Sequence, residues 1–79
     1  PMATAYLLIE SGRVTTAEFV SGSKPIPHDK LEIAMAHALA AEYLGFRFVY
    51  LEAGSGAQRS VSPAMVKAVA DYVQVPVIV

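Results

Sequence analysis

The chain has 79 residues, no cysteine and a formal net charge of −1 at pH 7. Its length allows one small domain or part of one, and a chain this short buries only about 60% of the surface that it exposes when unfolded. Apolar residues and glycine together make about 60% of the sequence, above the globular average of about 45–50%. We therefore expect the chain to associate with further polypeptide or to be part of a larger protein.

The same counts exclude several classes of protein. The six Lys and Arg residues are spread singly, so they do not form the basic patch that nucleic-acid binding requires. The lack of cysteine excludes a disulfide scaffold and a thiolate metal site, and it fits a cytoplasmic location. The most apolar helical stretch, 33–44, contains His37 and Glu42 and is too short to span a bilayer. No basic segment followed by an apolar core indicates a signal peptide.

The first third of the chain predicts two strands and a loop. Residues 5–9 form a short apolar run that ends in a Glu-Ser-Gly turn, and residues 14–20 alternate weakly and contain two threonines. The Ser-Gly between the two runs favours a hairpin. Residues 21–27 predict a loop, because the closely spaced Pro25 and Pro27 prevent regular hydrogen bonding.

A helix is predicted over residues 30–44, which are strong helix formers. Asp29 is the expected N-cap, and Glu32 three residues later completes a pattern like a capping box. Gly45 fits the left-handed position just past the helix end. Alanines along the helix allow close approach to a sheet.

The remaining residues predict a strand, a helix and a strand. Residues 46–51 form the clearest strand, and a glycine-containing loop follows over residues 53–61. Ser62 is expected to cap a second helix with Pro63 at its first position. That helix runs almost to the β-branched run 75–79, which predicts the last strand.

The expected order over the whole chain is β-β-α-β-α-β. From residue 29 onward, helix and strand alternate with short connections, which is the repeating unit of a parallel α/β protein. The last run is continuous in branched residues, and such a strand needs a neighbour on each side. We therefore expect residues 1–79 to be a single partial segment of a larger sheet, without an internal domain boundary.

In parallel α/β proteins the functional residues lie at the carboxyl ends of the strands. Successive side chains of a strand alternate between its faces. One face of the predicted strand 46–51 and its exit carries Phe46, Phe48, Tyr50 and Glu52, and the other carries Arg47, Val49 and Leu51. The first face becomes polar only at its carboxyl end, as a strand does when it runs from a core into a site. The aliphatic pair on the second face suits packing against helices.

The residues at this strand exit suit a polyol phosphate. Glu52 can accept hydrogen bonds from hydroxyls or take a proton, and the Tyr50 hydroxyl can donate to a phosphate. Gly54-Ser55-Gly56 lets backbone amides approach an anion closely. A cross-strand tyrosine, an exposed glutamate and an ordinary flexible turn would also explain these residues.

Other motifs are weaker. The stretch 54–59 lacks the third glycine of a dinucleotide fingerprint and the Gly-Lys-Ser/Thr of a P-loop. His28 and His37 do not share a helical face and have no nearby carboxylate at ligand spacing, so we expect both to be structural and predict no metal site. Serine and histidine are not spaced as in a hydrolytic triad. Lys24 and Arg59 are expected to be solvated loop charges.

The octapeptide 50–57, Tyr-Leu-Glu-Ala-Gly-Ser-Gly-Ala, resembles the signature of the geranylgeranylglyceryl phosphate synthases. These are archaeal prenyltransferases related to the bacterial heptaprenylglyceryl phosphate synthases. The resemblance covers nearly the whole chain and is carried also by Ala5-Tyr6-Leu7, Lys24-Pro25-Ile26-Pro27, Asp29-Lys30, residues 40–45 and residues 75–79. It implies a segment of a modified TIM (β/α)8 barrel, roughly its fifth to seventh strands.

The resemblance implies an enzyme of lipid biosynthesis that joins geranylgeranyl diphosphate to the C3 hydroxyl of sn-glycerol 1-phosphate. The reaction forms the ether bond of archaeal membrane phospholipids and releases diphosphate with Mg²⁺. The family's glycerol phosphate contacts fall on Tyr50, Leu51, Glu52, Ala53, Gly54, Ser55 and Gly56. Within this set, Glu52 is expected to hold and deprotonate the nucleophilic hydroxyl, while Tyr50 and the glycine loop position the substrate.

Parts of the family's site are not expected in these residues. Its metal-binding acidic residue lies near the first barrel strand, and its main phosphate-binding glycines follow the strand that here ends at Val79. We therefore expect the isolated segment to be inactive. The resemblance also implies a cytoplasmic enzyme, peripheral membrane contact, and a homo-oligomer or association with the rest of the barrel. A non-catalytic βα module that self-associates through its sheet edges, and another phosphate-binding TIM-barrel enzyme, stay open as alternatives.

Overall fold

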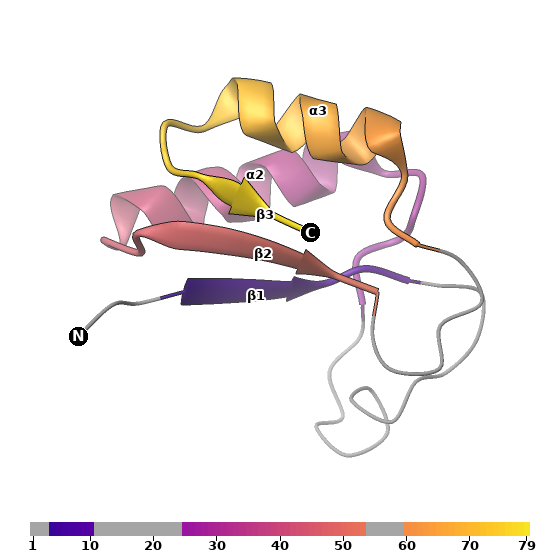
Figure 1. The fold of residues 1–79 in the computed structure, drawn as a ribbon, viewed down its shortest axis with the longest axis horizontal. Coiled ribbons are helices and arrows are strands. Elements are labelled where there is room, and N and C mark those ends of the chain that lie inside the picture. The colour runs from indigo at the N-terminus through magenta and orange to yellow at the C-terminus, as the bar shows by residue number, and fades with distance from the viewer. Residues whose placement is uncertain (1–3, 11–24, 54–59) are drawn as a thin grey trace, which may run out of the picture.

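The computed structural model describes residues 4–10, 25–53 and 60–79. A three-stranded sheet carries two helices on one of its faces (Figure 1). The elements in chain order are β1 (Thr4–Leu8), α2 (Leu31–Tyr43), β2 (Phe48–Glu52), α3 (Pro63–Tyr72) and β3 (Val77–Ile78). The predicted alternation from residue 29 onward is confirmed. The predicted strand over 14–20 and its hairpin lie outside the described residues.

All the strand pairings are parallel, and β2 lies between β1 and β3. Tyr6 is opposite Tyr50, Leu8 is opposite Glu52, and Ile78 is opposite Tyr50 on the other side. The chain passes through α2 between β1 and β2 and through α3 between β2 and β3, in keeping with the crossover connections that parallel pairing requires. The three strands point in the same direction in Figure 1, so their carboxyl ends form one edge.

The pairing of β1 continues past its last residue. Ile26 forms an isolated parallel bridge with Ile9. The Ile26 N–H donates to the Leu8 carbonyl over 2.8 Å, and the Glu10 N–H donates to the Ile26 carbonyl over 2.7 Å. The predicted loop over 21–27 is therefore wrong at Ile26. The prolines on either side have no N–H, but Ile26 keeps its own and can form a bridge between them.

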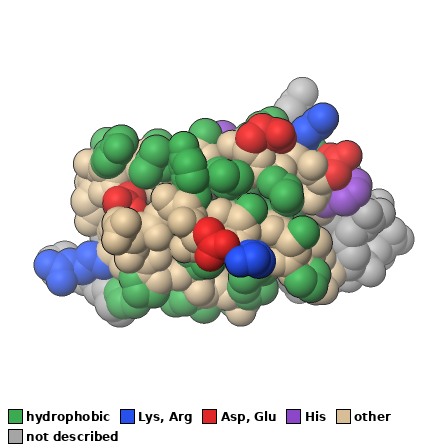
Figure 2. Space-filling view, turned by 90° about the horizontal axis from the view of Figure 1, so that it is seen from above, with side chains coloured by type: hydrophobic (Ala, Val, Ile, Leu, Met, Phe, Trp, Pro, Cys, Tyr) green, Lys and Arg blue, Asp and Glu red, His purple; other side chains and the backbone are tan. Residues whose placement is uncertain are grey.

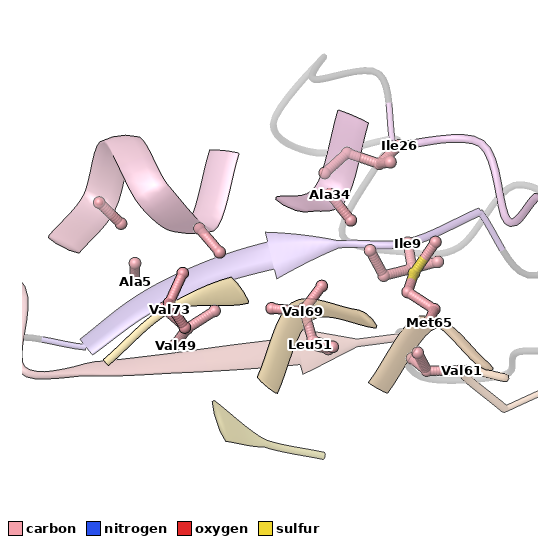
Figure 3. Packing of buried hydrophobic residues seen from close by; sticks show 12 residues of the cluster. Ala5, Ile9, Ile26, Ala34, Val49, Leu51, Val61, Met65, Val69 and Val73 are labelled. Carbon is pink, nitrogen blue, oxygen red and sulfur yellow. The ribbon is translucent and has the colours of Figure 1, made fainter. Parts of the chain in front are cut away.

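The core lies between the sheet and the two helices (Figure 3). On the central strand, Val49 and Leu51 are 0% and 1% exposed, which confirms the predicted helix-facing pair. α2 contributes small side chains that let its backbone come close to the sheet, namely Ala34, Ala38 and Ala41. α3 contributes Met65 and Val69, both fully buried. Removing this apolar surface from water is the main term that stabilises the layers.

α2 begins differently from the prediction and ends as predicted. Lys30 occupies the N-cap position and no side chain caps the helix, so the predicted Asp29 cap is wrong. The reason is local: the Lys30 N–H donates to the Pro27 carbonyl over 3.1 Å, and this turn places Asp29 before the cap position. At the other end Gly45 has φ +94°. Its N–H and that of Phe46 donate back to the last turn, which is the Schellman arrangement.

α3 begins as predicted. The Ser62 hydroxyl accepts a hydrogen bond from the Met65 N–H at 3.1 Å, and Pro63 occupies the first turn. On its solvent face, Lys67 donates to the Asp71 carboxylate over 2.7 Å. This hydrogen bond and the charge of Asp71 raise the pKa of the Lys67 amine. The pair's small contribution to stability is therefore present at neutral pH and is lost as the pH rises through the raised pKa.

β2 and β3 are shorter than predicted. β2 begins at Phe48 because Phe46 is used by the helix end, and it extends one residue further, to Glu52. β3 covers two residues, although the carbonyl of Pro76 also accepts from the Val49 N–H at 3.0 Å. Beyond the strands, the Glu42 carboxylate accepts from the Gln74 N–H at 2.6 Å and ties the ends of the helices together. Among the described helices, none is long and apolar enough to cross a membrane.

Candidate functional site

The candidate site lies where β2 ends, at the carboxyl edge of the sheet. Buried Val49 and Leu51 alternate with half-buried Phe48, Tyr50 and Glu52. The predicted division of the strand into two faces is therefore confirmed over these five residues. The polar end of the open face coincides with the carboxyl edge of the sheet, where parallel α/β proteins carry their functional groups.

A hollow of about 290 Å³ lies at this edge. It is lined by Tyr50, Leu51, Glu52, Ala53, Ser60, Val61 and Val79. The structure thus brings together the first four predicted site residues. The other three, Gly54, Ser55 and Gly56, lie outside the described residues.

Ser60 and Val79 were not predicted to belong to the site. Ser60 lies shortly before α3 in the chain, and it is exposed. Val79 follows the last residue of β3, the strand beside β2. The signal for Val79 was available in the sequence, because the carboxyl ends of neighbouring parallel strands meet at one edge.

Tyr50 has an aromatic partner on the neighbouring strand. The ring centroids of Tyr50 and Tyr6 are 5.4 Å apart and their planes are tilted by 34°. Offset, tilted pairs of this kind attract each other and restrict the rings. The cross-strand role that the sequence left open for Tyr50 is therefore present, and the same residue also lines the hollow.

The main chain of Glu52 is held by β1. The Ile9 N–H donates to the Glu52 carbonyl over 2.8 Å, which adds one backbone hydrogen bond just past the end of β1. The Glu52 side chain is half-buried, and it lines the hollow instead of standing fully in solvent. A carboxylate in this setting can accept a hydrogen bond from a ligand hydroxyl and can take its proton.

A second carboxylate lies at the end of β1. His28 Nδ1 and Glu10 Oε1 are 2.5 Å apart, with side chains 44% and 33% exposed. No carboxylate stands at metal-ligand spacing from His28 in the sequence, and its partner Glu10 comes instead from a strand end 18 residues away. His37 is structural, as predicted: its Nδ1 lies 2.8 Å from the Ile33 carbonyl one turn earlier in α2.

The resemblance places the family's metal-binding acidic residue outside this segment. Within 4–10, 25–53 and 60–79, no three or more His, Asp or Glu side chains are grouped so that they could hold an ion.

The parallel βαβαβ arrangement, with polar groups at one strand exit, is that of a segment of a (β/α)8 barrel. The model of the PcrB family matches residues 1–79, and the chain belongs to this family. A geranylgeranylglyceryl phosphate synthase of Spirosoma linguale is 50% identical over 78 residues, and one of Nitrosopumilus maritimus is 61% identical over 69 residues. The alignments cover 99% and 87% of this chain but 31% and 27% of those proteins.

Two solved structures share the fold. The crystal structure of (S)-3-O-geranylgeranylglyceryl phosphate synthase from Thermoplasma acidophilum in complex with substrate sn-glycerol-1-phosphate has a TM-score of 0.86 and 39% identity. The wild-type synthase from Thermoplasma volcanium has a TM-score of 0.85 and 36% identity. Each alignment covers 96% of this chain and 30% of the other. The relatives come from bacteria as well as archaea, so membership of the family does not imply an archaeal source.

Proposed function

We propose that this chain is the part of a geranylgeranylglyceryl phosphate synthase that binds sn-glycerol 1-phosphate and activates its C3 hydroxyl. The observation that carries the proposal is the hollow at the carboxyl edge, into which Tyr50 and Glu52 project from one face of β2. A relative of the same fold, 39% identical to this chain, is described as a complex with sn-glycerol-1-phosphate. The activity belongs to a complete barrel, because the chain spans about 30% of the length of its relatives.

The reaction is the displacement of diphosphate by an alcohol. The C3 oxygen of the glycerol phosphate forms a bond to the first carbon of the prenyl group, while the bond from that carbon to the diphosphate oxygen breaks. The electron pair of the broken bond leaves with diphosphate. The hydroxyl proton passes to the Glu52 carboxylate, which makes the oxygen a better nucleophile as the bond forms.

Tyr50 and the glycine loop position the substrate in this proposal. The Tyr50 hydroxyl donates a hydrogen bond to the glycerol phosphate, and its ring is already restricted by Tyr6. The backbone amides of 54–56 approach the phosphate, because glycine permits close contact with an anion. Holding the alcohol in one orientation beside its base supplies much of the rate enhancement.

Three further features are proposed for the complete protein. The prenyl diphosphate and its Mg²⁺ are bound by strand ends outside this segment, with the ion carrying the charge of the leaving group when it is present. The enzyme is cytoplasmic and contacts the membrane peripherally, since its product carries a lipid chain. The segment is completed by the rest of the barrel, and the barrel associates with further copies.

The test is a Glu52→Gln substitution in a complete barrel that carries this segment. The amide is the same size but cannot take a proton, so we expect turnover to fall by about 100-fold or more while sn-glycerol 1-phosphate still binds. Binding is measured by calorimetry and turnover by release of diphosphate. Asp71→Asn, the same change at an exposed carboxylate on α3, is the matched control.

The control variant should keep wild-type turnover. If Glu52→Gln also turns over at the wild-type rate, Glu52 is not the base and the assignment is wrong. If both the binding and the turnover of Glu52→Gln are lost while its melting temperature is unchanged, Glu52 acts in binding. The deprotonation step would then need another group.

A further inference from the structure

The pair of Glu10 and His28 lies at the same sheet edge as the candidate site. Glu10 is the second residue after β1, and Glu52 is the last residue of β2. Leu8 is opposite Glu52 in the register, and side chains two residues apart on a strand share a face. Glu10 therefore stands on the same face of the sheet as Glu52, one step further along the neighbouring strand.

Backbone hydrogen bonds connect this pair to Glu52. The Ile9 N–H donates to the Glu52 carbonyl, while the Glu10 N–H beside it donates to the Ile26 carbonyl. The end of β1 is thus held between Glu52 on one side and the segment 26–28 on the other. The 2.5 Å contact between His28 Nδ1 and Glu10 Oε1 adds a side-chain tie on the second side.

The contact between His28 and Glu10 matters more for where it holds the end of β1 than for its contribution to stability. Both side chains are partly exposed, at 44% and 33%, and exposed ion pairs contribute little to overall stability. A reacting group, by contrast, loses most of its effect when it is displaced by about 1 Å. A tie that stabilises the fold only slightly can therefore still matter for the rate, if it fixes the strand end against which a base is held.

We propose that Glu10, held by His28, is a positioning residue for Glu52, because it fixes the end of β1 whose Ile9 N–H holds the Glu52 main chain. The inference depends on the proposed role of Glu52 as the base. Neither Glu10 nor His28 needs to touch the substrate for this role.

The test uses His28→Ala and His28→Asn in a complete barrel that carries this segment. Alanine removes the contact, whereas the asparagine amide places an N–H close to the position of Nδ1 and can still donate to Glu10. We expect kcat of His28→Ala to fall by about tenfold with KM for sn-glycerol 1-phosphate changed by less than about threefold. His28→Asn should recover most of kcat, and the melting temperature of both should stay within a few degrees of the wild type.

Lys67→Ala is the matched control, since it breaks a more exposed ion pair on the surface of α3 and should leave kcat unchanged. The inference is overturned if His28→Ala keeps kcat within twofold of the wild type, or if His28→Asn is as slow as His28→Ala. Glu52→Gln separates the two proposals. If that variant loses turnover while His28→Ala does not, only the positioning role fails, and if Glu52→Gln is fully active the proposed function fails first.

Discussion

At the scale of single residues, the site depends on the alternation of side chains along β2. Leu51 and Glu52 are neighbours in the sequence, yet Leu51 is 1% exposed in the core and Glu52 is half-buried on the opposite face of the strand. Tyr50 stands on the same face as Glu52 and is supported across the sheet by Tyr6. One strand of five residues therefore places one face in the core and leaves the other half-buried for the proposed ligand.

Substitution of Tyr50 by phenylalanine isolates the role of its hydroxyl. The ring contact with Tyr6 is kept, so the sheet should not change, but the proposed hydrogen bond to the substrate is lost. A hydrogen bond of this kind contributes about 0.5–1.5 kcal/mol, so we expect the Kd for sn-glycerol 1-phosphate to rise by about threefold to tenfold. Calorimetry on a complete barrel measures this change.

Tyr6→Phe is the control for the same experiment. Tyr6 belongs to the same ring pair but is 66% exposed and does not line the hollow. Its substitution should leave the Kd within twofold of the wild type. Equal effects of the two substitutions would mean that the tyrosines act through the sheet and that the Tyr50 hydroxyl does not bind the ligand.

At the scale of elements, the sequence predicted those helix ends that depend on contacts between residues close in the chain. Gly45 ends α2 because it tolerates φ +94°, and Ser62 begins α3 because its hydroxyl can reach the Met65 N–H. In each case the signal and the backbone group that it contacts lie within four residues, so neither depends on the rest of the chain. The order of the elements from residue 29 onward followed from the same kind of pattern.

The failures arose where partners come from distant parts of the chain or where two local signals compete. The bridge of Ile26 to Ile9 and the contact of His28 with Glu10 depend on how β1 is placed in space, which no local pattern encodes. Asp29 had the sequence signature of a cap, but the hydrogen bond from Lys30 to Pro27 shifted the start of the helix. For the same reason, the strand exit at Glu52 could be predicted and its neighbour Glu10 was missed.

The two helix starts give a matched pair of substitutions. Ser62→Ala removes a capping hydrogen bond, so we expect the free energy of unfolding to fall by about 1 kcal/mol. Asp29→Ala should change it by less than about 0.5 kcal/mol, because Asp29 caps nothing. Urea titration of a complete barrel measures both. A larger loss for Asp29→Ala than for Ser62→Ala would contradict the observed helix starts.

At the scale of the whole molecule, the two sides of the sheet are unequal. The helix layer covers one side, and its outer surface mixes hydrophobic side chains with charges of both signs (Figure 2). On the open side Tyr6 is 66% exposed and Ile78 41% exposed, and the adjoining Val79 is 56% exposed. The exposed side chains on this side are largely apolar away from its carboxyl end, so most of its area suits contact with protein.

The isolated 79-residue chain should therefore associate and should not catalyse prenyl transfer. Exposed apolar surface and open parallel edges favour contact between copies, and a barrel site needs groups from several strand ends. Light scattering coupled to size-exclusion chromatography gives the assembly state, and release of diphosphate gives the activity. A monomer that turns over glycerol phosphate and prenyl diphosphate would contradict this account.

The most direct test of the central claim is a crystal structure of a complete barrel that carries this segment, with sn-glycerol 1-phosphate bound. We predict that the ligand occupies the hollow beside β2, with a Glu52 carboxylate oxygen within hydrogen-bonding distance of a glycerol hydroxyl, about 2.6–3.2 Å. The Tyr50 hydroxyl should be within reach of the same ligand. Glycerol phosphate bound elsewhere in the barrel, with Glu52 turned into solvent, would contradict the account.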